Sequence, residues 1–175
     1  MVDLLSDLSY VHYVDFYYGA EYIVLKTSNQ KVRCVSGNIA TTQSFTDNGD
    51  GTIKDNHTSL IWQKCIMGFN NDINCSDDGN GTNNASTWAD ALAYCENLNL
   101  GGSTNWRLPN INELKSILDN KKVSAPFVDN LFLNTTGPFW TSSTNIANTN
   151  DAFYVYFYDG YVVINLKRSR LPFVV

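Results

Sequence analysis

Two runs along the chain alternate between apolar and polar residues with the period of a β-strand. In the first, over residues 10–25, Val14 and Phe16 fall on one face and Gly19 marks a turn, so the pattern predicts a hairpin. A further short strand is expected over residues 32–35.

The second run lies near the C-terminus and repeats the first. Tyr154 to Gly160 has the same apolar and turn positions as Tyr13 to Gly19, which indicates a tandem array. We therefore expect three parts: residues 1–35 as the closing strands of a preceding repeat, which would also be able to complete the fold, residues 36–43 as a linker, and residues 44–175 as the main domain.

Helical spacing appears twice between these runs. Thr87 precedes an apolar stripe and predicts a capped helix that ends at Gly101. The second helix is predicted over residues 111–119, because Asn110 is a favourable N-cap and Glu113 follows three residues later, as in a capping box.

The turn before the second helix, Trp106 to Asn110, is the landmark around which the main domain is arranged. Pro109 fixes φ and prevents an earlier helix start. We expect Trp106 and Leu108 to be core residues and Arg107 to pair with a carboxylate. The alternative is a direct contact between this turn and a ligand.

Strands and loops account for the rest of the main domain. Asn-Gly-Asp-Gly predicts a hairpin within residues 44–55, Leu60 to Cys65 predicts a strand, and closing strands begin near Gly137. Residues 68–86 form a loop rich in Gly, Asn and Asp.

Composition narrows the class of protein. Apolar residues make up 43% of the 175 residues, which is enough for a core, and the formal net charge is −5. Because basic clusters are absent from the sequence, nucleic-acid binding is disfavoured, and no apolar run reaches membrane-spanning length. The first twenty residues do not read as a signal peptide, so an exported form would need a signal outside this chain.

The number and spacing of the cysteines and histidines indicate neither a zinc site nor a catalytic site. Four cysteines contain no CxxC pair, and the two histidines, His12 and His57, have no nucleophile-elbow motif with them. We therefore expect no enzyme. An even cysteine count favours disulfides in an oxidising compartment, and the alternative is four reduced, buried cysteines.

Calcium is the one cofactor worth considering. Oxygen-bearing side chains crowd the 68–86 loop and the first hairpin, although neither has EF-hand spacing and Asn-Gly-Asp-Gly is more typical of a plain turn. The candidate ligands in the loop, which we prefer to the hairpin, are Asp72, Asn74, Asp77 and Asp78.

Tyrosines near the C-terminus are the clearest sign of a binding surface. Strand alternation places Val155 and Phe157 in the core and turns the tyrosines outward. Exposed Tyr beside Asn is typical of recognition surfaces, whereas the structural alternative is cross-strand pairing of tyrosines or their burial under residues 10–35. The candidate ligand-binding residues are Tyr154, Tyr156, Tyr158, Tyr161, Asp159, Asn148 and Asn150.

A set of motifs in a fixed order covers residues 44–175 and resembles the Lcl C-terminal domain, a bacterial family named after part of a collagen-like adhesin. The matching segments are Phe45–Thr52, Leu60–Gln63, Thr87–Trp88, Ala91–Cys95, Trp106–Asn110, Glu113–Leu114, Phe139–Ser143 and Tyr154–Gly160. The resemblance implies an α+β, C-type-lectin-like fold with two helices, a twisted antiparallel sheet and long loops. It also implies a secreted or cell-surface protein.

The family's last strand carries a cysteine that residues 171–175 lack and that Cys34 matches. We therefore expect residues 31–35 to supply the closing strand, within the chain or by strand exchange in a homo-oligomer, with Cys34 bonded to Cys95. Cys65 and Cys75 would then clip the long loop.

These features together predict a non-enzymatic adhesion module that binds a protein or carbohydrate through the tyrosine-rich face, without nucleic acid or membrane insertion. The alternative is a structural spacer whose tyrosines pack one repeat on the next.

Overall fold

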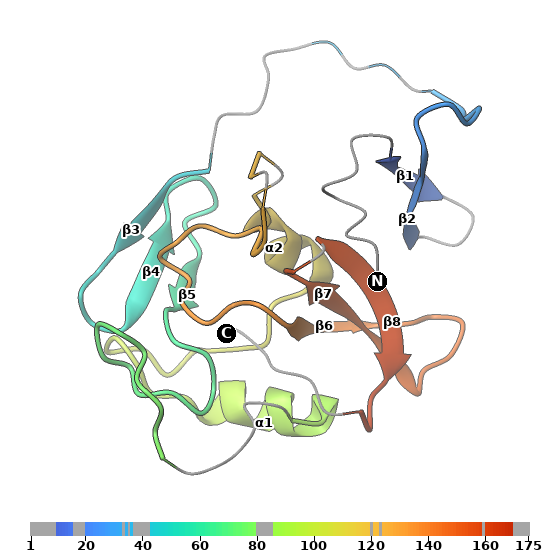
Figure 1. Ribbon diagram of the computed structural model, residues 1–175. Coiled ribbons are helices and arrows are strands. Elements are labelled where there is room, and N and C mark those ends of the chain that lie inside the picture. Colours follow the sequence, from blue (N-terminus) through green and yellow to red (C-terminus); the bar gives the residue numbers. More distant parts are fainter. Residues whose placement is uncertain are drawn as a thin grey trace.

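The architecture is taken from a computed structural model, which describes residues 10–15, 20–32, 34, 36, 43–79, 86–119, 121–122, 124–158 and 160–169. It is an α+β protein with two short helices and antiparallel sheets (Figure 1). No helix within these residues is both long and apolar enough to cross a membrane.

The C-terminal sheet forms one side of the core. It has the order β6-β7-β8, with β6 at Pro138–Thr144, β7 at Asp151–Tyr156 and β8 at Tyr161–Leu166. Val155 and Phe157 are fully buried, as their position in the alternation predicts. Phe139 packs edge-on against Phe157, so this sheet contributes aromatic residues to the main hydrophobic cluster.

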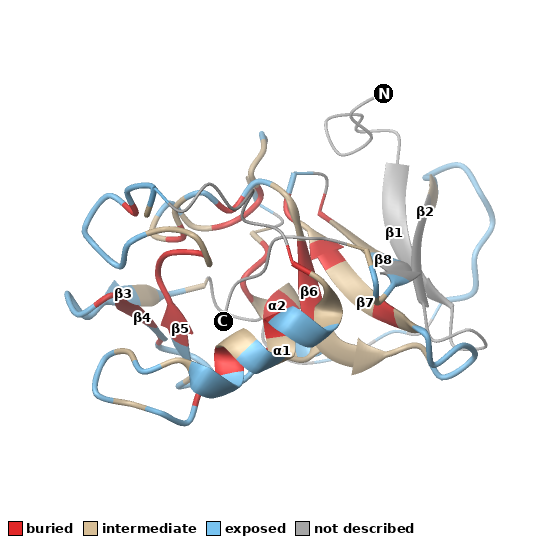
Figure 2. Ribbon diagram, turned by 90° about the horizontal axis from the view of Figure 1, so that it is seen from below, coloured by how far each residue is buried: buried red, intermediate tan, exposed pale blue. Residues whose placement is uncertain are grey.

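A smaller sheet of order β3-β4-β5 closes the other side of the core. It contains β3 (Phe45–Asp47), β4 (Thr52–Asp55) and β5 (Ile61–Gln63), and it confirms the hairpin predicted around Asn-Gly-Asp-Gly. Trp62 and Phe45 from this sheet contact Phe132 edge-on. Figure 2 shows buried residues on β4 and β5 and, across the core, on β6 and β7.

Both helices begin where the sequence predicts. Helix α1 spans Trp88–Asn97 and α2 spans Ile111–Ser116, and each has a complete capping box, built by Thr87 with Asp90 and by Asn110 with Glu113. Both end earlier than expected. The residue after α1, Leu98, takes an extended conformation, and its apolar side chain still packs against the core from outside the helix.

The N-terminal hairpin lies beside the C-terminal sheet. Strands β1 (Tyr10–Asp15) and β2 (Ala20–Leu25) pair antiparallel, and β2 contacts β8 (Figures 1 and 2). The hairpin prediction is therefore confirmed, whereas its origin in a preceding repeat stays a prediction.

The expected strand over residues 32–35 is wrong for the described part of that segment. Residues 31, 32 and 34 belong to no strand, and the Val32 side chain is 83% exposed. Cys34 is an exposed free thiol and Cys95 is a buried one, so the pairing of Cys34 with Cys95 within one chain is also wrong. The physical reason is that Cys95 lies on the inner side of α1, enclosed by the core, while Cys34 stays in solvent.

Candidate functional site

The predicted tyrosines differ in exposure, since Tyr158 is exposed whereas Tyr154, Tyr156 and Tyr161 are half-buried and the Tyr161 hydroxyl is buried. Tyr154 packs edge-on against the fully buried Trp140, and desolvation raises the pKa of its phenol. The outward position expected for Tyr154 is thus only partly realised. The reason is that Tyr154 lies directly across the ladder from Trp140, on the same face of the sheet, so the buried indole covers part of its ring.

The other three tyrosines gather where β7 turns into β8, and we call them the tyrosine patch: Tyr156, Tyr158 and Tyr161. Tyr156 lies directly across from Tyr161 in the ladder. The rings of Tyr156 and Tyr158 are 6.2 Å apart and inclined by 32°, and Tyr158 is 48% exposed. Asp159, predicted beside them, lies outside the described residues.

The predicted asparagines are not part of this group. Asn148 and Asn150 are exposed and belong to the loop at the opposite end of β7, roughly 20 Å from Tyr156 at the rise of an extended strand. Asn148 donates to the Asp151 carboxylate at 2.9 Å, and Asn150 O accepts the N–H of Lys167. Both therefore shape the loop, and one ligand of ordinary size would not reach them and the tyrosine patch together.

The predicted disulfide between Cys65 and Cys75 is present, with an S–S distance of 2.06 Å. It closes a loop that contains the candidate calcium ligands Asp72 and Asn74, whereas Asp77 and Asp78 follow the second cysteine. Asp72 accepts the N–H groups of Asn74 at 2.9 Å and of Ser76 at 3.1 Å, as well as the Ser76 hydroxyl, and these bonds lower the pKa of its carboxyl.

Asp77 is used in a similar local way, since its carboxylate accepts the Gly79 N–H at 2.8 Å. Among the residues that the structure describes, no three His, Cys, Asp or Glu side chains come together as a metal site would require. Asp72 therefore organises the loop by its own hydrogen bonds, and Asp77 and Asp78 do not join it in a group of three carboxylates.

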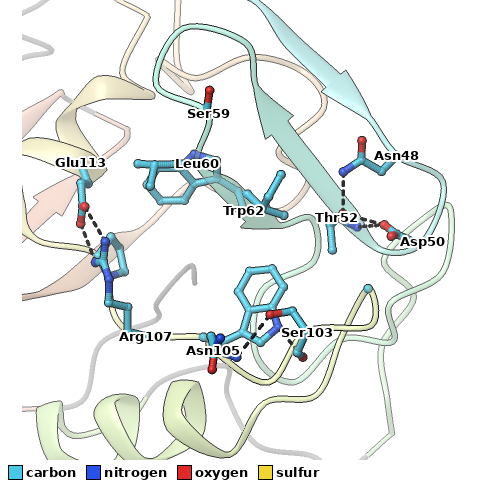
Figure 3. Close-up of a pocket in the computed structure, with 14 residues that line it drawn as sticks. Asn48, Asp50, Thr52, Ser59, Leu60, Trp62, Ser103, Asn105, Arg107 and Glu113 are labelled. Atoms are coloured by element: carbon cyan, nitrogen blue, oxygen red, sulfur yellow. Dashed lines mark hydrogen bonds and ion pairs between the residues drawn. The ribbon is translucent and has the colours of Figure 1, made fainter.

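A cleft of about 400 Å³ opens beside β5, and the sequence did not predict it. One side comes from four consecutive residues, 59–62, and the other from the 103–109 turn before α2 (Figure 3). The apolar part of its lining consists of Leu60, Ile61, Trp62, Trp106 and Pro109. The polar part includes Asn48, Asp50, Ser59, Ser103, Asn105, Arg107 and Glu113.

One end of this cleft depends on a tight contact between two turns. A Cβ on Gly101, whose φ is +58°, would come within 2.7 Å of Thr52 Cγ2 and 3.1 Å of Asp50 Oδ2. Asp50 in turn accepts the Thr52 hydroxyl at 2.6 Å, and Asn48 donates to the same hydroxyl at 2.8 Å. The Asn-Gly-Asp-Gly turn is therefore a structural part of the cleft wall.

The side of the cleft opposite Asp50 carries an ion pair (Figure 3). The guanidinium of Arg107 donates to both carboxylate oxygens of Glu113, at 2.7 and 2.6 Å, and Glu113 also accepts the Asn110 N–H at 2.8 Å. Arg107 lowers the pKa of the Glu113 carboxyl. This confirms the expectation that Arg107 pairs with a carboxylate, and Trp106 and Leu108 are buried as predicted.

The cleft has the chemistry of a binding site, because an apolar floor is rimmed by side chains that donate and accept hydrogen bonds. One signal in the sequence pointed to it. Leu60, Ile61 and Trp62 are three consecutive apolar residues, so one of them has to lie on the outer face of a half-buried strand. Ile61 is that residue, and it is 44% exposed.

His57 lies in the turn after β4, where its main-chain N–H donates to Asp55 at 2.8 Å. The side chain of His12 lies outside the described part of the structure.

Comparison with known proteins gives one match. The sequence matches the family model described as the Lcl C-terminal domain over residues 51–174. No curated protein and no solved structure matches.

Proposed function

The chain belongs to the Lcl C-terminal domain family, and from this premise we propose that it is a non-enzymatic module that binds a protein or carbohydrate ligand outside the cell. The tyrosine patch is the surface on which we place recognition. The proposal includes a C-type-lectin-like arrangement of the α+β fold and needs no cofactor.

The observation that carries this proposal is the pairing of Tyr156 and Tyr158 with Tyr158 largely open to solvent. Two rings inclined by only 32° offer a broad, rigid face at small cost in rotamer entropy, and their hydroxyls supply adaptable hydrogen bonds. The disulfide between Cys65 and Cys75 is compatible with an oxidising, extracellular setting.

Binding of the purified chain to a printed array of neutral and charged oligosaccharides and purified extracellular-matrix proteins tests the proposal. We expect at least one ligand whose signal falls about tenfold, equal to about 1.4 kcal/mol, when Tyr156 and Tyr158 are both changed to Ser. Ile146→Ser is the matched control, since Ile146 is 98% exposed at the far end of the β6–β7 hairpin. Ligands that bind the Tyr156→Ser, Tyr158→Ser variant as well as the wild type would contradict the proposal.

A structural spacer is the second candidate, and one observation favours it. Strand β2 contacts β8, and Leu25, Val163 and Leu166 on these strands are large apolar residues with 38–43% exposure. In an array of repeats, such residues would be covered by the next unit. In that case a second copy of the chain would associate through β8, by packing or by exchange of the N-terminal strands, and light scattering would detect the oligomer.

A further inference from the structure

The cleft beside β5 supports an inference that is independent of the tyrosine patch. We propose that an extended peptide segment, neutral or basic in charge, binds in this cleft by adding to the free edge of β5 at Ile61 and by placing an apolar side chain on its floor.

The first argument is the direction of the main-chain groups of β5. This strand is at the edge of its sheet. Leu60 O accepts the N–H of Asp55, and the N–H of Lys64 donates to Gly51, both at 2.9 Å, so the even-numbered residues bond to β4. Successive residues point to opposite sides of a strand, and Ile61 therefore turns its N–H and C=O away from β4.

This edge has no strand paired to it within the described residues. The hydrogen bonds that those residues form outside the ladders do not use the main chain of Ile61. An N–H and a C=O from one residue on an open edge form the two-bond pattern that an added peptide strand completes.

The second argument is that the cleft follows this edge. Neighbouring side chains in a strand point to opposite faces, yet Ile61 and Trp62 of β5 both line the cleft. The space therefore wraps around the edge and is not confined to one face. Leu60 and Pro109 supply aliphatic surface to the lining, and Ile61, which is 44% exposed, extends that surface to solvent.

The third argument is charge. The ionised side chains of the lining are Asp50, Arg107 and Glu113, so the cleft carries one positive and two negative charges. Arg107 donates two N–H groups to Glu113, and its remaining N–H groups are available to a carbonyl oxygen of the peptide. An acidic ligand is disfavoured, whereas a peptide with lysine near its ends complements the cleft.

The tryptophans distinguish a peptide from a sugar. Trp62 is 2% and Trp106 is 9% exposed, so neither offers an open ring face for stacking on a sugar ring. The Trp62 indole N–H is buried and has no hydrogen-bond partner among the described residues, although Trp62 lines the cleft. A buried donor without a partner costs free energy, and a ligand carbonyl that reached this N–H from the cleft would bind more tightly by removing that cost.

Nuclear magnetic resonance of the ¹⁵N-labelled full chain tests the proposal. The probe is the blocked hexapeptide Ac-Lys-Thr-Val-Thr-Val-Lys-NH2. We expect saturable shifts of the Ile61 amide and of the Trp62 and Trp106 indole signals, with a Kd of about 1 mM or tighter. The indoles of Trp88 and Trp140, which donate to Thr141 O and Ser86 O, serve as internal controls and should not shift.

Two altered peptides separate strand addition from other binding modes. N-methylation at alternate residues removes main-chain donors, and replacement of both lysines by glutamate reverses the charge. Each change should weaken binding about tenfold. Equal binding of the N-methylated peptide, no saturable shift below about 10 mM of the parent peptide, or shifts caused only by cellobiose would overturn the proposal.

A matched pair of protein variants examines the edge itself. Ile61→Pro removes the outward N–H while the β4 ladder keeps its donors, and proline is tolerated at such edge positions. Ile61→Pro should weaken binding of the parent peptide about tenfold, whereas Ile61→Val should leave the affinity unchanged. Should Ile61→Pro lose the folded spectrum, the comparison of parent and N-methylated peptides on the wild-type chain decides alone.

Discussion

At the scale of single residues, Glu113 ties the first turn of α2 to the turn that precedes it. Its carboxylate receives two bonds from Arg107 and one from the N–H of the N-cap residue Asn110. It therefore holds the turn before α2 in place and fixes the direction of Arg107. Arg107 is 57% exposed, so solvent screens the pair and keeps its contribution small.

Glu113→Gln isolates the charge of this carboxylate, since glutamine at this helix position can still bond the N-cap main chain. We expect the free energy of unfolding to fall by about 0.5–1 kcal/mol at neutral pH. Because pairing with Arg107 lowers the folded-state pKa of Glu113, its stabilisation is complete above the unfolded value of 4.5 and is lost as the pH falls through the folded-state value. Urea unfolding should thus show a wild-type advantage that disappears in acid, and an advantage that does not depend on pH would contradict the assignment.

Gly101 illustrates a constraint that single-residue chemistry imposes on the cleft. Gly101→Ala should destabilise the fold by about 3 kcal/mol, from a strained positive φ together with a clash against Thr52. Gly102→Ala is the control, since its φ is +74° but nothing lies within 4 Å of the added carbon, and it should cost only about 1–2 kcal/mol. Chemical denaturation of both variants measures the difference, and equal losses would show that the contact between the two turns is unimportant.

At the scale of elements, local signals in the sequence predict where each helix begins but not where it ends. Thr87 and Asn110 cap their helices because a cap depends on residues within one turn. The end of α1 at Asn97 depends instead on how Leu98 packs against the core, which local spacing does not encode.

The disulfide between Cys65 and Cys75 stabilises the fold by closing a short loop. Replacing both cysteines by alanine should lower the free energy of unfolding by about 2–3 kcal/mol, because the unfolded chain regains the entropy of a short closed loop. Calorimetry of the Cys65→Ala, Cys75→Ala variant beside reduced wild type measures this loss. A change below about 0.5 kcal/mol would show that the hydrogen bonds of Asp72 hold the loop without the disulfide.

At the scale of the whole molecule, the features that the sequence did not predict all depend on contacts between distant segments. One part of the cleft wall depends on the contact between Gly101 and the turn at Asp50, and Tyr154 is half-buried because it packs against Trp140 of the neighbouring strand. The alternation of apolar and polar residues within one strand does not show whether side chains of another segment pack on its outer face.

The reactivity of the thiols of Cys34 and Cys95 tests whether the N-terminal segment pairs with the main domain. Alkylation of the native chain without reductant should modify exposed Cys34 and spare Cys95, whose pKa burial raises to about 12. After denaturation, still without reductant, both should react while Cys65 and Cys75 remain linked. Protection of Cys34 in a reducible dimer would instead support the predicted exchange between chains, in which Cys34 bonds the Cys95 of a second copy.

The most direct test of the central claim compares melting and ligand binding of the Tyr156→Ser, Tyr158→Ser variant on one preparation. If the tyrosine patch is a recognition surface, binding is lost while the melting temperature stays within about 3 °C of the wild type, the shift produced by about 1 kcal/mol in a chain of this size. A larger fall in melting temperature would mean that these tyrosines pack for stability. The structural-spacer account would then replace the binding account.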